Sequence, residues 1–272
     1  MQRRIWFRST IFAMLLVLLS TLTVSSVTVV AGRRDYAVNQ GSMVNVPILN
    51  YHMVGDLSIA LCISADGFDQ QMKYLFDNGY TTITPDQLLA HMKYGKPLPE
   101  KPVMITFDDG YLDNYTTAYP ILKKYEQKAV FFLITGYIGV DPRFMNWQQA
   151  KEMSDNGMSM QAHTVNHVNL TKLAPEEAYR ELAESKRTLE EELGKPVRYL
   201  AYPEGGVNKS VAQLAKTAGY RGAFSVRFGE ASSNSDSLAI ERIPIFRSAK
   251  TFRSFFLRLN AAPVLERFGL IR

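Results

Sequence analysis

Residues 102–110 read PVMITFDDG and combine an apolar segment with two adjacent carboxylates and a glycine. The first six of these residues have the apolar and β-branched character of a buried strand. A helix is predicted to follow over residues 112–128, and a second apolar strand over residues 129–134. One buried strand joined to the next by a helix is typical of a parallel sheet with helices packed against it.

The same order of elements recurs on both sides of this stretch. Further strands are expected at residues 44–51, 80–84, 158–162, 197–202 and 220–225, and further helices at residues 66–78, 85–92, 147–156, 175–193 and 209–218. Three of these helices end at a glycine that leads into a strand, and glycine ends a helix at little cost because it adopts the left-handed conformation. This many alternating units predict an α/β fold with a closed or nearly closed barrel.

The N-terminal residues have the features of an export signal. Three arginines within the first eight residues precede a run without charged residues over positions 11–31. Such a run fits either a cleaved signal peptide or an uncleaved membrane anchor. We therefore divide the chain into a signal peptide or N-terminal membrane anchor (1–31), a linker (32–43) and one catalytic domain with a C-terminal extension (44–272). In either case the domain is expected outside the cytoplasm, secreted or anchored to the outer face of the cytoplasmic membrane.

The composition is that of a globular protein, with 46% hydrophobic and 21% charged residues among 272. Without the three N-terminal arginines, 28 of the 31 basic residues remain against 26 acidic ones, so the net charge falls from +5 to +2. This balance gives no reason to expect nucleic acid as a partner. A single cysteine, Cys62, excludes an intramolecular disulfide and a thiolate zinc cluster. The protein is expected to be a monomer.

Polar residues that directly follow predicted strands are the candidates for chemistry, because active sites in such folds lie at the carboxyl ends of the strands. They are His52, the pair Asp108–Asp109, His163 and the segment Pro203–Glu204. Two adjacent carboxylates repel each other unless one is neutralised, and a divalent cation neutralises a carboxylate well.

His163 and His167 are four residues apart, a spacing at which one helical turn would place both imidazoles on the same side. Two histidines with one carboxylate leave coordination positions open, as at a catalytic metal site. Each pattern alone also has a structural explanation, namely a turn with helix-capping aspartates and a solvated helix face. Their joint placement at strand ends favours a site for one divalent metal ion, with zinc expected first and cobalt, nickel or iron as alternatives.

Two motifs in this chain resemble those of a known enzyme family. The segments Thr106–Gly110 and His163–His167 look like the first two signature motifs of the NodB-type polysaccharide deacetylases, carbohydrate esterase family four. The resemblance spans about residues 44–247 and implies an irregular (β/α) barrel of about seven parallel strands. It also implies that Asp109 and the two histidines hold the metal and that Asp108 is the general base. His52 resembles the N-terminal histidine of the poly-N-acetylglucosamine deacetylase branch, where that residue is the general acid.

The chain departs from the family pattern at later motifs. The third motif usually reads Arg-x-Pro-Tyr-Gly, but Ala201–Gly205 stands in its place, and the fourth and fifth motifs are absent. The backbone N–H of Glu204 is then the expected oxyanion donor, since it needs no side chain. Arg242 is a candidate to replace the missing arginine as the partner of Asp108, and the alternative is a surface arginine at a strand edge. The expected substrate-binding residues are Tyr111, Tyr202, Pro203 and Glu204.

The resemblance implies metal-dependent hydrolysis of N-acetyl groups from an extracellular or cell-wall glycan that contains N-acetylglucosamine. An N-acetylated polysaccharide is therefore the expected partner, and the membrane is a second one if the N-terminal segment is uncleaved. One alternative is a glycan-binding protein that has the fold but no turnover, and another is a deacylase of a different N- or O-acyl substrate. An iron oxygenase with two histidines and one carboxylate would predict a jelly roll of short strands, whereas this chain alternates strands and helices.

Overall fold

The computed structural model of the protein describes residues 44–247 and 251–267. The expected signal or anchor (1–31) and linker (32–43) lie outside these residues. Among the residues described, no helix is both long enough and apolar enough to span a bilayer.

Seven parallel strands form a closed barrel, which confirms the predicted fold class. Their order around the barrel is β1-β10-β9-β8-β7-β6-β5, and a direct pairing between β1 and β5 closes the ring. The strands are β1 (Ile48–Tyr51), β5 (Pro102–Phe107), β6 (Val130–Leu133), β7 (Ser159–Ala162), β8 (Tyr199–Ala201), β9 (Gly222–Phe228) and β10 (Ile240–Pro244). Outside the ring, β4 (Thr81–Thr82) pairs with the start of β5, and β2 (Met53–Val54) pairs with β3 (Cys62–Ile63).

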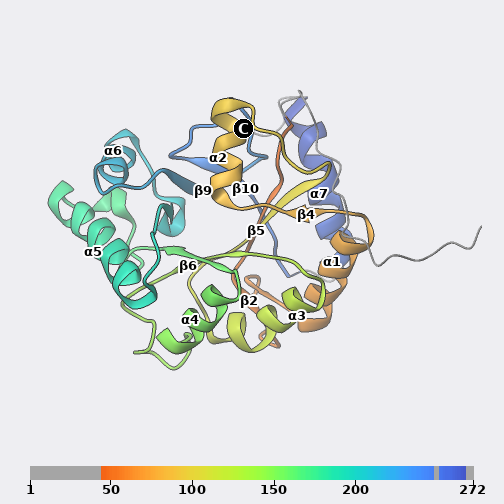
Figure 1. Cartoon of the computed structure of the whole chain (residues 1–272), viewed down its shortest axis with the longest axis horizontal. Coiled ribbons are helices and arrows are strands. Elements are labelled where there is room, and N and C mark those ends of the chain that lie inside the picture. Colours follow the sequence, from red (N-terminus) through yellow and green to blue (C-terminus); the bar gives the residue numbers. More distant parts are fainter. Residues whose placement is uncertain (1–43, 248–250, 268–272) are drawn as a thin grey trace, which may run out of the picture. The chain divides into compact units, whose positions relative to one another are not determined.

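Helices connect the strands and surround the barrel (Figure 1). They are α1 (Ala65–Asp77), α2 (Pro85–Tyr94), α3 (Tyr119–Lys124), α4 (Trp147–Asp155), α5 (Pro175–Leu193), α6 (Lys209–Thr217) and α7 (Thr251–Arg267), with short 3-10 turns η2 (Leu170–Lys172) and η3 (Pro203–Gly205). Capping side chains at the helix N-termini explain where several of the helices begin. For example, the Thr84 and Gln87 side chains form a capping box at the start of α2, with Pro85 as the first helical residue.

The helix predicted over residues 112–128 is wrong in its extent. A turn of π-helix, η1 (Asn114–Ala118), precedes the six-residue α3. Pro120 has no N–H to donate to the carbonyl four residues earlier, and the Tyr119 N–H bonds instead to the Asn114 carbonyl, five residues earlier. The ordinary helical ladder is therefore interrupted close to the strand end that carries the two aspartates.

Alternate residues of the strands divide the core into two clusters. The cluster inside the barrel includes Ile48, Met104, Phe132, Phe224 and Ile240, whereas the other strand face packs against the surrounding helices. Helix α2 contributes Leu88 to the inner cluster, and its Asp86 accepts a hydrogen bond from the Tyr199 hydroxyl (2.7 Å) at the start of β8. This helix thus covers the amino ends of the strands and leaves their carboxyl ends for the candidate site.

Candidate metal centre

The two aspartates leave strand β5 through a sharp turn. Asp108 continues the ladder, because its N–H donates to the Tyr51 carbonyl (3.0 Å), whereas Asp109 has a positive φ of 76°. Gly110 follows at φ +85°, and a Cβ there would lie 2.8 Å from the Leu133 side chain. A non-glycine residue with positive φ is uncommon because it costs free energy, and such strained residues cluster at functional sites. The turn separates the two carboxylates, which point to different partners.

The two histidines lie on an irregular loop after β7, and the predicted helical turn between them is wrong. Thr164 and His167 have positive φ values of 65° and 55°, so the loop is not helical. The His167 N–H donates to the Thr164 hydroxyl oxygen (3.1 Å), which closes the turn. The rings nevertheless come together, with centroids 4.9 Å apart.

One carboxylate oxygen faces both histidines. Asp109 Oδ1 lies 3.4 Å from His163 Nε2 and 3.3 Å from His167 Nε2. Ligand atoms around a tetrahedral ion with bonds of about 2.0–2.1 Å are roughly 3.3 Å apart, so this spacing fits a metal ion between them. Asp109 Oδ1 is buried and accepts no hydrogen bond among the described residues, as expected of an atom reserved for a ligand. The three residues therefore form a possible metal-binding set.

A backbone contact orients the buried histidine. His163 Nδ1 lies 2.7 Å from the Ala201 carbonyl, to which it donates, so the lone pair of Nε2 faces Asp109. The His163 side chain is only 2% exposed, whereas that of His167 is 33% exposed. The site is therefore closed on the barrel side and open to solvent beside His167.

Arg242 of strand β10 forms a bidentate ion pair with Asp108 through both terminal nitrogens. The two N–H···O contacts are 2.8 and 2.7 Å long, and the Arg242 Nε donates to the Ser225 carbonyl at 2.9 Å. Arg242 is fully buried, which rules out a surface arginine at this position. Burial alone would raise the pKa of the Asp108 carboxyl, but the Arg242 guanidinium holds this pKa well below its usual range. Asp108 is thus an oriented, ionised carboxylate beside the three-residue set.

His52 follows β1 and lies close enough to the two aspartates to interact electrostatically with both. Burial lowers the pKa of His52, and the Asp108 and Asp109 carboxylates oppose this effect. Its backbone carbonyl accepts a hydrogen bond from Asn114 Nδ2 (2.7 Å), and the Asn114 side chain is fully buried in η1. Sequence reasoning missed Asn114, because nothing in the local pattern indicates that the π-turn meets the end of β1.

The two tyrosines of the expected substrate-binding set are placed differently. Tyr111 is partly exposed and stacks on Phe144 at 4.9 Å between ring centroids, and burial together with the neighbouring Asp109 raises its pKa. Tyr202 is only 1% exposed, and its hydroxyl donates to the Leu238 carbonyl (2.9 Å). The expectation that the Tyr202 ring contacts substrate is therefore wrong, because the ring is enclosed by the core and its polar atom is already bonded.

The segment in place of the third motif forms the turn η3. Its hydrogen bonds run from the N–H groups of Gly205 and Gly206 to the carbonyls of Tyr202 and Pro203, so the Glu204 N–H takes no part in them. Pro203 is buried, and Glu204 has a positive φ of 55°. The Glu204 carboxylate points elsewhere, accepting a hydrogen bond from Asn169 Nδ2 (3.0 Å).

A closed parallel barrel with a carboxylate-and-histidine set at the carboxyl ends of its strands defines the chain as an α/β barrel with a possible metal site. Comparison with known proteins gives the family. The family model described as "Polysaccharide deacetylase" matches residues 95–223, which include Asp108, Asp109 and both histidines of the set. The chain belongs to the polysaccharide deacetylase family of NodB type and is a hydrolase that acts on amide bonds of polysaccharides.

Three relatives show the extent of the similarity. The "Putative polysaccharide deacetylase YxkH" of Bacillus subtilis (strain 168) is 36% identical over 200 residues, 74% of this chain and 71% of the relative. A poly-beta-1,6-N-acetyl-D-glucosamine N-deacetylase of Staphylococcus aureus (strain MRSA252) is 32% identical over 197 residues, 67% of each chain. The solved structure of Streptococcus pyogenes deacetylase PplD in complex with acetate is 32% identical, with a TM-score of 0.76 over 80% of this chain and all of that one.

Proposed function

We propose that the protein removes N-acetyl groups from a polysaccharide that contains N-acetylglucosamine, using a divalent metal ion, zinc first among the candidates. The observation that carries the proposal is the convergence of Asp109 Oδ1 and the two histidine Nε2 atoms beside an ionised Asp108. Support for the substrate class comes from the Staphylococcus aureus relatives, which are named as poly-beta-1,6-N-acetyl-D-glucosamine N-deacetylases.

Each part of amide hydrolysis has a candidate group. When bound by Asp109, His163 and His167, a divalent ion would supply Lewis-acid polarisation of the acetyl carbonyl and a more acidic water. The Asp108 carboxylate is our candidate to accept the proton of the attacking water, and Arg242 keeps that carboxylate ionised and oriented.

The remaining two roles concern the oxyanion and the leaving group. The Glu204 N–H is our candidate donor to the oxyanion, because the turn η3 leaves it out of its own hydrogen bonds. His52 is our candidate acid, which would protonate the amine as the carbon–nitrogen bond breaks and acetate is released. Tyr111 borders the same edge of the barrel as a candidate contact for the sugar.

We also propose where the domain acts. The uncharged run at positions 11–31 supports a secreted protein or one anchored to the outer face of the cytoplasmic membrane. In this arrangement residues 32–43 are the linker, residues 44–272 are the catalytic domain, and the protein acts as a monomer.

The test combines metal analysis with acetate release. We expect Asp109→Ala and His163→Ala to lose both the bound metal and the release of acetate from poly-N-acetylglucosamine, because each removes one of three ligands. His91→Gln is the matched control, since His91 lies outside the site with its ring nitrogens 2.7 and 3.1 Å from the Lys96 and Val44 carbonyls. Full activity in either ligand variant would refute the proposal.

Two further comparisons separate the roles and the alternatives. His52→Gln should slow turnover and leave the metal bound, and unchanged turnover would remove His52 from the mechanism. A panel of chitooligosaccharides, poly-N-acetylglucosamine, peptidoglycan and O-acetylated esters distinguishes the substrate. Binding of a glycan without acetate release from any of them would indicate a binding protein instead of an enzyme.

A further inference from the structure

In the loop that carries His163 and His167, the carbonyl groups of two successive residues accept backbone hydrogen bonds. The Thr164 carbonyl accepts from the Thr135 N–H (3.1 Å), and the Val165 carbonyl accepts from the Gly136 N–H (2.9 Å). Both donors follow strand β6, so these bonds hold the loop against the neighbouring strand end. They restrain one edge of each peptide plane and leave the N–H edge to another partner.

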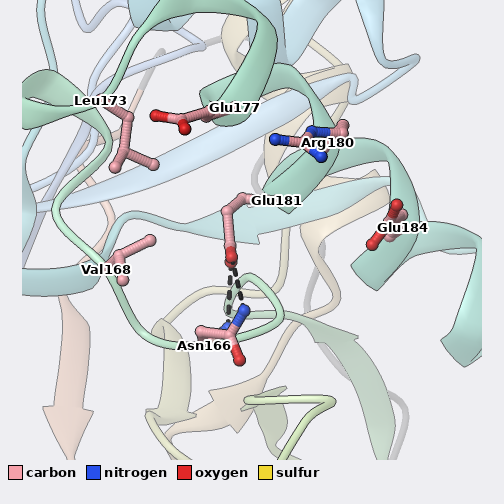
Figure 2. A pocket seen from close by; sticks show the side chains of 7 residues that line it. All are labelled: Asn166, Val168, Leu173, Glu177, Arg180, Glu181 and Glu184. Atoms are coloured by element: carbon pink, nitrogen blue, oxygen red, sulfur yellow. Dashed lines mark hydrogen bonds between the residues drawn. The ribbon is translucent and has the colours of Figure 1, made fainter.

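That other partner is the Glu181 carboxylate of helix α5. Glu181 Oε2 accepts from the N–H groups of Val165 and Asn166, both at 2.9 Å, and Oε1 accepts from Asn166 Nδ2 at 2.7 Å. Figure 2 shows the Glu181 side chain pointing down from α5 onto Asn166, with the bonds from the Asn166 N–H and Nδ2 drawn as dashed lines. The two peptide groups between Thr164 and Asn166 are therefore bonded at both their carbonyl and N–H ends.

Glu181 differs in this respect from the other acidic residues of the same helix face. Glu177 and Glu184 also line the pocket of about 340 Å³ beside the loop, but both are exposed. In Figure 2 the Glu184 carboxylate lies away from Asn166. Glu181, by contrast, is partly buried against the loop.

We propose that Glu181 is a positioning residue that holds the metal-binding loop in the conformation that presents His167 to Asp109. The proposal rests on the proposed metal site. The loop has left-handed φ values at Thr164 and His167, and such a conformation persists only where surrounding bonds impose it. A carboxylate suits this position because its charge strengthens three converging N–H···O bonds at once.

The test measures zinc affinity of the full chain by competition with a chelator. For Glu181→Ala we expect binding to weaken about 10- to 100-fold, the usual effect of losing a group that orients a metal ligand. Glu181→Gln should fall between that variant and the wild type, because one amide oxygen still accepts both backbone N–H groups. Asn166→Ala should cost less than Glu181→Ala, since the backbone bonds remain. Glu184→Ala and Glu184→Gln, the matched controls, should bind zinc as the wild type does.

A second measurement separates positioning from a general loss of stability. Cobalt substituted for zinc reports the coordination geometry through its visible absorption, and we expect the spectrum to change in Glu181→Ala and not in Glu184→Ala. The proposal would be overturned if Glu181→Ala and Glu184→Ala both bind zinc within about threefold of the wild-type affinity and share its cobalt spectrum. If Glu181→Ala does not fold, equal affinities of Glu181→Gln, Glu184→Gln and the wild type overturn it. A wild-type chain that binds no zinc or cobalt would instead refute the metal site itself.

Discussion

Asp108 and Arg242 form an ion pair that is buried inside the barrel, with side chains 3% and 0% exposed. The cost of removing two charges from water offsets most of their attraction, so such a pair adds little net stability. Its consequence is chemical, because the two-pronged contact fixes the orientation of Asp108 and keeps it ionised. The Arg242 guanidinium also lies 5.7 Å from the centre of the Phe132 ring, within the range of a cation–π contact.

Asp113 leads to a prediction about pH. Burial raises the pKa of Asp113 to about 6, although its hydrogen bonds to the Val54 N–H and the Asn114 side chain oppose the shift. The unfolded chain releases this proton near pH 3.9. The contribution of Asp113 to stability is therefore fully present below about pH 4 and is lost as the pH rises through about 6. We expect Asp113→Asn to gain stability relative to the wild type over this interval, as measured by thermal unfolding at a series of pH values.

Asp141 offers a control of opposite sign. The Arg143 side chain lowers the pKa of Asp141, so its contribution is present above about pH 4 and falls away only in acid. Asp141→Asn should therefore show no relative gain as the pH rises. A constant difference in melting temperature between Asp113→Asn and the wild type from about pH 4 to pH 7 would contradict the assignment to Asp113.

The loop between β7 and α5 depends on close backbone packing as well as on side chains. A Cβ at Gly136 would lie 2.6 Å from the Val165 carbonyl oxygen, and that oxygen accepts the Gly136 N–H. We expect Gly136→Ala to displace the loop, to cost about 1–3 kcal/mol as overpacking does, and to weaken zinc binding. Chemical denaturation and chelator competition measure the two effects.

Gly194→Ala is the control for this prediction. Gly194 ends α5 at φ +65°, with no heavy atom within 4 Å of an added Cβ. Alanine there should lower stability by about 1 kcal/mol through its left-handed conformation and leave zinc affinity unchanged. If both glycine variants bind zinc with equal affinity, the predicted link between Gly136 and the metal loop is wrong.

The metal set joins segments that are distant in the chain, so metal should stabilise the domain as a unit. Asp109 follows β5, whereas His163 and His167 follow β7. Free zinc at a thousand times its dissociation constant would stabilise the folded state by about 4 kcal/mol. At 2–4 °C for each kcal/mol in a domain of this size, we expect a chelator to lower the melting temperature by roughly 10 °C. The melting temperature of Asp109→Ala should not respond to zinc or chelator, and an unresponsive wild type would contradict the prediction.

The linear sequence was sufficient to predict the barrel and the centre of its site. Strands such as β5 and helices such as α5 depend on hydrophobic periodicity and end signals, which are properties of neighbouring residues. The placement of Asp108, Asp109 and His163 could also be predicted, because polar residues after parallel strands meet at one edge of a barrel. Local signals failed at η1, where Pro120 interrupts the helical ladder, and at the turn between the two histidines.

The sequence offered Arg242 as a partner of Asp108, with a surface arginine as the alternative, and closure of the barrel decides for the partner. Arg242 and Asp108 are 134 positions apart, and they meet because β1 pairs with both β5 and β10. Glu181 looks like any other exposed acid of a charged helix until α5 packs beside the loop. The physical reason is that hydrophobic periodicity and helix caps act within a few residues. Desolvation, ion pairing and the hydrogen bonding of buried backbone groups depend instead on which segments the fold brings together. The sequence alone thus determined the architecture and the metal ligands we propose, and the tertiary structure determined the groups that orient them.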